Sequence, residues 1–384
     1  MHAVKVRGPN DLFIDSTAPV PTVRPGHLLI KVLSVALNPT DWKRVAIFKK
    51  EVPHTVGLDV AGRVVECGDE VGQEYKVGNR VAGLCYGIKA GDPLSGAFGE
   101  YALLKGALSL PVPDDVSDAE AATIPVGTNF VGQVEQTMIA LYQTLKLPPP
   151  SPPSKPKSLG PAVLIYGGAT ASGMFGLQFA RLSGCHVLTT CSPRNFQLVK
   201  ALGAHEVFDY HDGGACAAAI RLATGDKLLY AFDCVSAGSS LQICADALTS
   251  QPDVAAYTAA LPIGEGFPRK DVRAGWTSGY SGGLVFHFSL LWCPSSEGSQ
   301  ERENSCRDYP IFTPRIKLTC TDNPGDAAFA VDFWMATAEL LRQDRLRLGP
   351  LVHERQGGLA GIAEGLAELR AGGVSAGKLV YTIE

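Results

Sequence analysis

A run of small residues between positions 167 and 173 is the part of the chain that predicts chemistry most directly. The segment VLIYGGATASGMFG carries glycine at 167, 168 and 173, with only alanine, threonine and serine between them. Such a run at the start of a helix lets a pyrophosphate approach the backbone, where the first N–H groups of the helix can bind it. The spacing departs from the usual G-x-G-x-x-G, but its hydroxyls add donors. The predicted contacts come from Gly168, Ala169, Thr170, Ala171 and Ser172. A tight strand-to-helix turn without a ligand is the alternative.

The stretch after the following strand indicates which dinucleotide is bound. NAD-dependent enzymes usually place an Asp or Glu about twenty residues beyond the turn, where it binds the ribose 2′-hydroxyl. Here the strand HVLTTC leads, with no carboxylate, into Ser192, Pro193, Arg194 and Asn195. A guanidinium attracts a 2′-phosphate that an acid would repel, so we predict NADPH. Tyr210, at the end of the third strand, is expected beside the adenosine. A solvent-facing arginine next to a helix N-cap, and a strand-end aromatic, are the alternatives.

Alternating strands and helices must position this turn. PAVLIYG, HVLTTC, EVFDY, YAFDCVS and VAAYTAA have the composition of buried strands, and helical segments separate the first three. That alternation predicts a parallel, doubly wound sheet. In the first 125 residues, short apolar runs are instead separated by glycine turns, which predicts a β-barrel-like lobe. The segment PPPSPPSKPKSLGP is expected to be a surface loop, with a polyproline II recognition site as the alternative.

Composition and charge limit the classes of function. At 384 residues the chain exceeds one ordinary core, so two domains are expected. A net charge of -4 gives no electrostatic reason to bind nucleic acid, and no apolar run has the length of a membrane span. The first residues read as a strand rather than a signal peptide. None of the ten cysteines forms a C-x-x-C pair, which favours buried free thiols in a reducing compartment. A cytoplasmic enzyme is therefore expected.

Several motifs occur in the order typical of the medium-chain dehydrogenase/reductase superfamily, which the sequence resembles over essentially its whole length. They are KVLSVALNPTDWKR, GLDVAGRVVECG, VGNRVAG, GAFGEYALL, EAATIPVGT and the strand–helix–strand unit that follows. More narrowly, NPTDWK, YGGATASG, CSPRNF, GAHEVFDY, YAFDC and GGVSAGKLVY resemble the fungal trans-acting enoyl reductases. Those enzymes serve highly reducing polyketide synthases, including synthase–peptide synthetase hybrids, whose own reductase domain is inactive.

The resemblance implies an α/β fold with two lobes. One is a GroES-like β-barrel lobe, and the other is a Rossmann lobe, a doubly wound parallel sheet, inserted within it. We expect residues 1–125 and 348–384 to form the GroES-like catalytic domain, and residues 126–347 to form the NADPH-binding domain. The substrate is then expected in the cleft, with the nicotinamide reaching into it.

The sequence lacks the zinc ligands that related alcohol dehydrogenases carry. Their early cysteine falls within NPTDWK here, and the equivalent of their Gly-His-Glu motif is Gly57, Leu58 and Asp59. Leucine cannot ligate zinc. The four closely spaced cysteines of their structural zinc site are also absent from YGIKAGDPLSGAFGEY. We therefore predict no metal site.

Enoyl reduction suits a site without a metal. Hydride adds to the β-carbon of an α,β-unsaturated thioester, and the thioester oxygen then needs hydrogen-bond donors rather than a Lewis acid. The resemblance implies a substrate tethered to an acyl carrier protein, a polyketide synthase as partner, and a role in fungal secondary metabolism. Two alternatives stay open: a stand-alone zinc-free quinone or enone oxidoreductase, and a non-catalytic dinucleotide-binding protein.

The resemblance also implies residues around the nicotinamide and the substrate. Lys43 is the strong donor there, either as a proton source or in positioning the cofactor, and water is the other proton source. The cofactor contacts implied by the matching motifs are Thr40, Asp41, Trp42, Lys43, Thr258, Ala259, Val374 and Ser375, the last four over the nicotinamide half. The residues implied for the substrate pocket, each with plain packing as its alternative, are Asn129, Phe130, Val131, Gly132, Gly279 and Tyr280.

Overall fold

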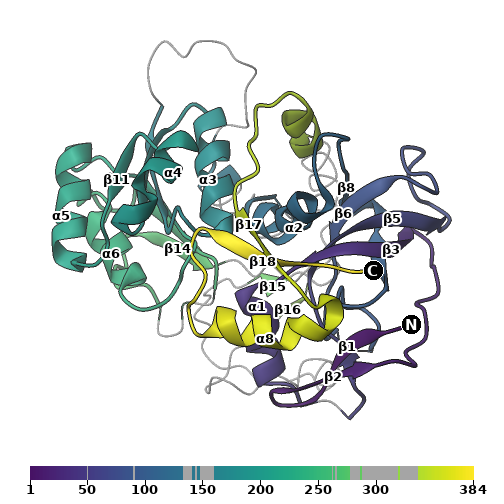
Figure 1. Cartoon of the computed structure of the whole chain (residues 1–384). Helices are drawn as coiled ribbons and strands as arrows, with labels where there is room; N and C mark the ends of the chain where they lie inside the picture. Colours follow the sequence, from purple (N-terminus) through teal and green to yellow (C-terminus); the bar gives the residue numbers. More distant parts are fainter. Residues whose placement is uncertain are drawn as a thin grey trace, which may run out of the picture.

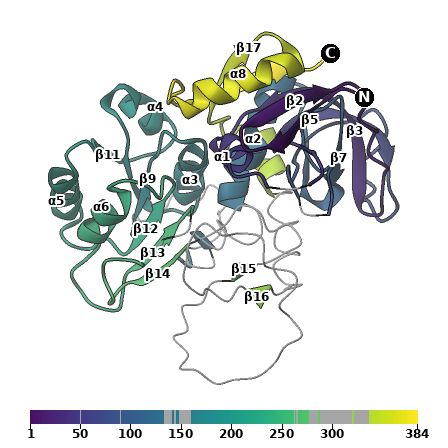
Figure 2. The ribbon, with the colours of Figure 1, turned by 90° about the horizontal axis from the view of Figure 1, so that it is seen from below.

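The computed structural model describes residues 1–49, 51–89, 91–132, 141–142, 145–147, 160–261, 263, 266–276, 286–287, 319–320 and 336–384. Two lobes lie side by side, one built around a parallel sheet and the other around a mostly antiparallel one (Figure 1, Figure 2). Both chain termini lie on the second lobe. The predicted α/β class, with a β-barrel-type lobe and a doubly wound sheet, is confirmed.

The first lobe contains a six-stranded sheet in the order β11-β10-β9-β12-β13-β14. Every neighbouring pair in it is parallel. The order reverses between β9 and β12, as in a doubly wound fold. The strands are β9 (Ala162–Tyr166), β10 (His186–Thr190), β11 (Glu206–Phe208), β12 (Tyr230–Asp233), β13 (Ala256–Ala259) and β14 (Arg273–Trp276).

Helices cover both faces of this sheet, because successive strand residues point to opposite sides. On one face, Val163 and Ile165 of β9 pack with Phe175 of α3. On the other, Leu164 packs with Ile220 of α5. Burial on both faces explains why these strands are almost continuously apolar. The helices of this lobe are α3 (Ala171–Leu182), α4 (Phe196–Ala201), α5 (Gly213–Thr224) and α6 (Ser240–Ala247).

The second lobe contains a seven-stranded sheet with the path β17-β18-β3-β5-β6-β8, and β7 pairs with β3. A three-stranded sheet, β2-β1-β4, completes the lobe. Because β17 and β18 come from the end of the chain, both ends of the sequence build this lobe. The strands are β1 (Ala3–Gly8), β2 (Asp11–Asp15), β3 (His27–Ala36), β4 (His54–Thr55), β5 (Asp59–Cys67), β6 (Arg80–Leu84), β7 (Tyr101–Lys105), β8 (Ser109–Pro111), β17 (Leu351–Arg355) and β18 (Gly377–Thr382).

Shorter elements surround the sheets. Helix α8 packs against α1 below the second lobe in the view of Figure 1. The remaining described elements are α1 (Pro39–Ala46), α2 (Asp118–Gly132), α8 (Gly358–Arg370), the 3₁₀ turns η1 (Gly106–Leu108) and η3 (Pro193–Asn195), the antiparallel pair β15 (Phe286–His287) and β16 (Thr319–Cys320), and a helical turn at 336–342.

The chain passes between the two lobes twice, first in α2 and again near Arg347. Gly127 of α2 faces α3 so closely that a Cβ atom there would lie 2.8 Å from the ring of Phe175. The predicted domain boundary falls inside α2, at Pro125. On the return crossing, the side-chain amide of Gln178 donates to the carbonyl of Arg347 at 3.1 Å and accepts its N–H at 2.7 Å. One buried glutamine therefore holds the chain against α3 where it re-enters the second lobe.

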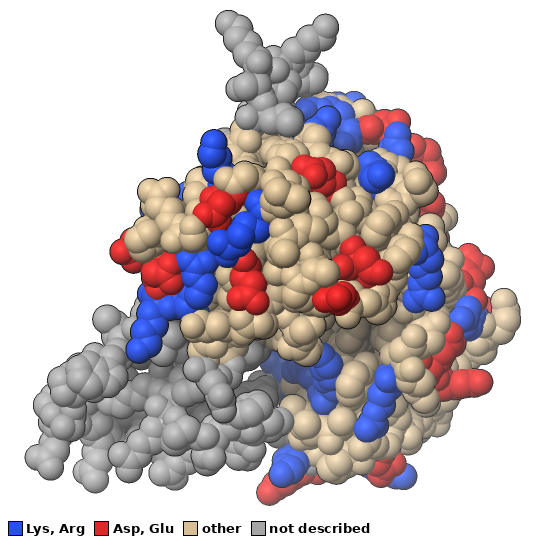
Figure 3. Space-filling model, turned by 90° about the vertical axis from the view of Figure 1, so that its left-hand side faces the viewer, with Lys and Arg blue, Asp and Glu red and all other residues tan. Residues whose placement is uncertain are grey.

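Thiols and surface charge agree with the expectations from composition. The seven described cysteines are all free, and five of them are buried. Within the described residues, no helix has both the length and the apolar character of a membrane span. On the face of the molecule in Figure 3, acidic and basic side chains are interspersed over the described surface.

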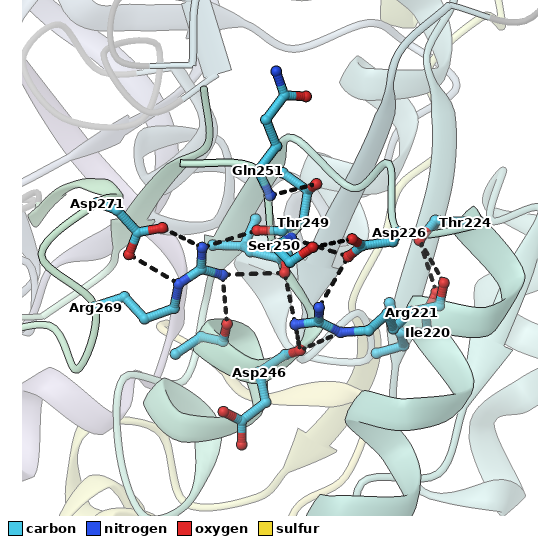
Figure 4. Close-up of polar contacts among 12 residues, drawn as sticks. Ile220, Arg221, Thr224, Asp226, Asp246, Thr249, Ser250, Gln251, Arg269 and Asp271 are labelled. Atoms are coloured by element: carbon cyan, nitrogen blue, oxygen red, sulfur yellow. Dashed lines mark hydrogen bonds and ion pairs between the residues drawn. The ribbon is translucent and has the colours of Figure 1, made fainter. Parts of the chain in front are cut away.

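Two arginines close the C-terminal end of α6 (Figure 4). Both guanidiniums donate to the carbonyl of Leu248, Arg221 at 2.9 Å and Arg269 at 3.1 Å. Arg269 also donates to the carbonyl of Thr249 at 2.9 Å. Asp226 holds the Arg221 guanidinium at 2.9 Å. Because the last carbonyls of a helix have no partner within it, this arrangement satisfies groups that would otherwise be left without a donor.

We expect Arg269→Ala to lower the free energy of unfolding by about 2 kcal/mol, because several carbonyls lose a charged donor at once. Urea and thermal unfolding would measure the change. Arg342→Ala is the matched control, since Arg342 pairs only with Glu339 across a helix surface and its side chain is 68% exposed. Solvent screens this exposed pair, so its loss should change stability little. Equal losses in the two variants would contradict this account of the α6 terminus.

Candidate active site

The carboxyl ends of β9 and β12 form the point where the strand order of the parallel sheet reverses. Ligands of doubly wound folds bind in the crevice at this point, because the loops leaving the two strands diverge. Gly167 follows β9 and Val235 follows β12 closely enough that a Cβ atom on Gly167 would lie 2.6 Å from Val235. The small-residue turn predicted from the sequence therefore lies at the place where a dinucleotide is expected.

Glycine is required at three positions of this turn. Gly167 has a φ of +80°, which side chains rarely adopt. A Cβ atom on Gly168 would lie 2.1 Å from the hydroxyl of Thr189, and one on Gly173 would lie 2.2 Å from the carbonyl of Gly167. The hydroxyl oxygen of Thr170 caps α3 by accepting the N–H of Gly173 at 3.0 Å. A side chain at 168 or 173 would therefore push the strand and helix apart.

A pyrophosphate fits the chemistry of this turn. Thr190 holds the turn rigidly, since its hydroxyl accepts the N–H of Gly167 at 3.0 Å and its carbonyl accepts that of Gly168 at 2.9 Å. The N–H groups of Ala171 and Ser172 belong to the first turn of α3, which has no partners within the helix. The Thr170 side chain also hydrogen-bonds with the thiol of Cys234, so its hydroxyl has two partners within this part of the fold.

The residues predicted for the adenosine end lie together beyond β10. The hydroxyls of Ser192 and Tyr210 are 3.3 Å apart, so the ends of β10 and β11 bring this predicted pair into contact. Arg194 is exposed on η3, and Asn195 is half-buried. Asp209, which precedes Tyr210, pairs with the ring of His211. The geometry leaves the Arg194 guanidinium open to an anion.

The residues predicted for the nicotinamide half are not all found in one place. Thr258 and Ala259 are fully buried at the carboxyl end of β13, and the Thr258 hydroxyl has no partner within the described part of the chain. Ser375, by contrast, accepts a hydrogen bond from the amide of Asn195 at 3.3 Å. One residue assigned to the nicotinamide half thus contacts a residue assigned to the phosphate end. Val374 packs against the core of the second lobe.

Helix α1 carries the NPTDWK residues. Asp41 is buried, and its carboxylate accepts the N–H of Asn38 at 2.8 Å, which closes the start of the helix. Thr40 is half-buried. Lys43 is exposed, with its ammonium 5.7 Å from the ring centre of Trp42. Asp41 thus caps its own helix, and its contact with the cofactor stays a prediction.

A buried ion pair between Asp59 and Lys378 lies beside this helix. Their side chains are 0% and 4% exposed, and the Lys378 ammonium donates to the Asp59 carboxylate. Asp59 also accepts the side-chain amide of Asn38 at 2.8 Å and the N–H of Val126 at 2.6 Å. A single carboxylate thus ties β5 to β18, to the start of α1 and to α2.

The bond from Val126 explains how α2 accommodates a proline. Pro125 lies inside the helix, where its ring prevents regular hydrogen bonding. The N–H of Val126 is directed to the Asp59 carboxylate instead. The Val126 N–H next to the proline is therefore satisfied by the ion pair rather than by the helix.

Burial raises the pKa values of both acids in this cluster. Burial raises the pKa of Asp41 to about 7, with the charge of Asp59 adding to it and the N–H of Asn38 opposing it. Burial likewise raises the pKa of Asp59, and the Lys378 ammonium opposes that shift most strongly. The ammonium favours a charged Asp59, which in turn favours a protonated Asp41.

The residues predicted for the substrate pocket are not among the side chains that the structure describes. Asn129, Phe130, Val131 and Gly132 form the end of α2, and their side chains lie outside the described part of the structure, as do Gly279 and Tyr280 entirely. The sequence analysis gave no role to Asn38, Asp59 or Lys378. A signal was present, since GLDVAGRVV places Asp59, and KLVY places Lys378, within an apolar strand.

No cluster of three metal-ligating side chains occurs among the described residues. Leu58, at the position of the family's histidine ligand, is 2% exposed. The next residue is Asp59, which is bound to an ammonium and two N–H donors.

Two protein families match parts of the chain. The alcohol dehydrogenase GroES-like domain matches residues 24–114, and the zinc-binding dehydrogenase family matches residues 171–271. Among curated proteins, the chain is 36% identical to the trans-enoyl reductase resD of Aspergillus sclerotiorum, over 100% of both chains. It is also 36% identical to a trans-enoyl reductase of Alternaria alternata, over 95% of this chain and 94% of the relative.

Solved structures with the same fold include two reductases. The quinone oxidoreductase from Coxiella burnetii has a TM-score of 0.67 at 22% identity, covering 100% of this chain and 99% of the other. The CurK enoyl reductase has a TM-score of 0.68 at 18% identity, with the same coverage. These structures support the predicted pairing of a GroES-like lobe with a Rossmann lobe.

We expect the stability conferred by Asp41 to fall as pH rises. Its folded pKa of about 7 exceeds the usual 3.8, so the folded protein keeps a proton that the unfolded chain releases between these values. Asp41→Asn has no such proton, and its amide oxygen can still accept the N–H of Asn38. Relative to the wild type, this variant should gain about 2 kcal/mol between pH 5 and pH 7, measured by urea unfolding. A pH-independent difference would contradict the shift.

We expect Lys378→Met to lower the free energy of unfolding by about 3–5 kcal/mol near pH 8, because it leaves the Asp59 carboxylate buried without a counter-charge. The loss should shrink toward pH 5 as Asp59 takes up a proton. Adding Asp59→Asn should restore most of the stability, since no uncompensated charge remains. Lys200→Met, at an exposed lysine of α4, is the control. If the double variant is no more stable than Lys378→Met, the ion pair is not the cause.

Proposed function

The chain belongs to the trans-enoyl reductases of the medium-chain dehydrogenase/reductase superfamily, and on that premise we propose that it reduces α,β-unsaturated acyl thioesters with NADPH. One observation carries the proposal: the identity to a trans-enoyl reductase extends over the full length of both chains. Both lobes therefore match, the one that would hold the dinucleotide and the one that would face the substrate. The reaction is reduction of a carbon–carbon double bond.

The chemistry needs hydrogen-bond donors and a dry, ordered site. When bound, NADPH supplies the hydride that adds to the β-carbon of the thioester. Negative charge then develops on the thioester oxygen, where a donor stabilises it. The ammonium of Lys43 is a donor exposed on α1, and it either binds that oxygen or positions the cofactor. Water is the other source of the proton that the α-carbon takes up.

Preference for NADPH over NADH rests on the residues that follow β10. Arg194 is an exposed cation on η3, and Ser192 brings a hydroxyl close to Tyr210. Arginine and hydroxyl groups match the charge and acceptor oxygens of a 2′-phosphate. We therefore propose NADPH as the physiological cofactor.

The substrate is proposed to be an acyl chain tethered to the carrier domain of a polyketide synthase that acts as a separate partner. The name shared by the relatives, trans-enoyl reductase, supports an enzyme that acts on another protein's intermediate. A cytoplasmic location in fungal secondary metabolism follows from that partnership. A second candidate, reduction of free quinones or enones, is favoured by the similarity in fold to quinone oxidoreductases.

We expect the purified protein to oxidise NADPH with crotonyl-coenzyme A or crotonyl-pantetheine, and to form the saturated thioester. Absorbance at the nicotinamide band and mass spectrometry of the product would measure this. A small quinone is the comparison acceptor, and a reaction without acceptor is the blank. Turnover of the quinone alone would favour the stand-alone reductase. NADPH binding with neither acceptor reduced would favour a binding protein.

We expect Arg194→Asp to raise KM for NADPH by roughly 10–100-fold, because a charge-assisted contact to the 2′-phosphate is replaced by repulsion. KM for NADH should change less than about threefold, since NADH has no such phosphate. Lys200→Asp, at an exposed lysine of the neighbouring helix, is the matched control for net charge. An unchanged KM for NADPH in Arg194→Asp would rule out this phosphate site.

A further inference from the structure

The segment between α8 and β18 makes a hydrogen bond from the second lobe to the first. The amide of Asn195, on η3, donates to the hydroxyl of Ser375 at 3.3 Å across 180 residues of sequence. Val374, next to Ser375, packs against the core of the second lobe. Ser375 is therefore held by one lobe and faces the predicted phosphate residues of the other.

The backbone that follows Ser375 is held in an unusual conformation. Ala376 has a φ of +55°, in the left-handed region that favours glycine. Its carbonyl accepts the N–H of Leu351 at 3.0 Å, which ties it to β17. Gly377 has no room for a side chain, because a Cβ atom there would lie 2.4 Å from the ring of His353. Such strained positions persist only where the surroundings fix them, and they gather at functional sites.

This short segment leads directly into the buried ion pair. Lys378 lies three residues beyond Ser375 and binds the carboxylate of Asp59. Asp59 in turn holds Asn38 at the start of α1. Three residues span at most about 10 Å. A displacement of Ser375 is therefore passed through a fixed backbone to the charges that hold the catalytic lobe together.

The hydroxyl of Ser375 can also donate a hydrogen bond. Its oxygen accepts from Asn195, so its O–H remains free to donate to an anion held by Arg194. An anion in that position would be bound by Arg194 from the first lobe and by Ser375 from the second. It would therefore join the lobes, whereas a cofactor without a phosphate at this position would not.

We propose that Ser375 is a positioning residue through which the 2′-phosphate of NADPH draws the catalytic lobe into its working alignment. The inference rests on the proposed use of NADPH. With Ser375 in this role, the 2′-phosphate affects turnover as well as affinity, because alignment of the lobes determines how the substrate meets the nicotinamide. Ser192, which contacts only the first lobe, should influence affinity alone.

Binding and hydrogen exchange test this without turnover. By calorimetry, Ser375→Ala should bind NADP⁺ about tenfold more weakly and NAD⁺ with less than a twofold change. Asn195→Ala should weaken NADP⁺ binding to the same extent. The double variant should bind NADP⁺ no more weakly than either single variant, because the two residues act as a unit. In the wild type, NADP⁺ should slow amide exchange in β17 and β18 more than NAD⁺ does. Ser375→Ala should abolish that difference, and Ser375→Thr should restore it.

Steady-state rates then separate coupling from simple binding. With the crotonyl thioester and NADPH, Ser375→Ala should lower kcat about tenfold, whereas Ser192→Ala should act mainly through a raised KM. Lys200→Ala, at an exposed lysine of α4, is the control and should change neither quantity by more than twofold. An equal loss of kcat with NADPH and NADH would overturn the proposal, as would additive effects of the two substitutions on binding. If the wild type binds NADP⁺ with the expected exchange pattern but reduces no thioester, the proposed function fails while this inference holds.

Discussion

The ion pair between Asp59 and Lys378 is the constraint around which the catalytic lobe is built. Removing two charges from water costs several kcal/mol per ion, and that cost is offset only if each keeps close partners. Asp59 finds them in Lys378, Asn38 and the N–H of Val126. Those partners come from β18, the loop before α1, and α2, so satisfying one carboxylate brings three distant parts of the chain to β5. The N–H that follows Pro125 in α2 and the side chain of Asn38 before α1 both bond to it.

The ion pair lies at the position where related alcohol dehydrogenases carry zinc ligands that this sequence lacks. At the position of the family's Gly-His-Glu motif this chain carries Leu58 and Asp59. The Asp59 carboxylate binds the Lys378 ammonium and amide donors. The ion pair ties β5 to β18, to the start of α1 and to α2, while donors on α1 and water are the proposed partners of the substrate oxygen. Hydride transfer requires the nicotinamide and the β-carbon to approach within roughly 3–3.5 Å in the right orientation, so a lobe tied together in this way serves the reaction directly.

Local features of the sequence predicted the dinucleotide lobe well. The turn from Gly167 to Gly173 and the order of buried strands depend on neighbouring residues, and the structure confirms the turn and the sheet. The buried ion pair could not be predicted in the same way, because Asp59 and Lys378 are 319 residues apart and pair only through the fold. The contact of Ser375 with Asn195 has the same origin. Family resemblance assigned Ser375 to the nicotinamide half, and the fold brings it to Asn195, a residue predicted for the other end of the cofactor.

Transfer of deuterium from specifically labelled NADPH tests the central claim, that hydride goes to the β-carbon of an enoyl thioester. With crotonyl-coenzyme A and each C4-deuterated NADPH epimer in turn, a single turnover should give butyryl-coenzyme A with one deuterium at the β-carbon from only one epimer. Mass spectrometry and NMR of the product would locate the label. Deuterium at the carbonyl carbon, or a saturated thioester without deuterium from either epimer, would contradict the account.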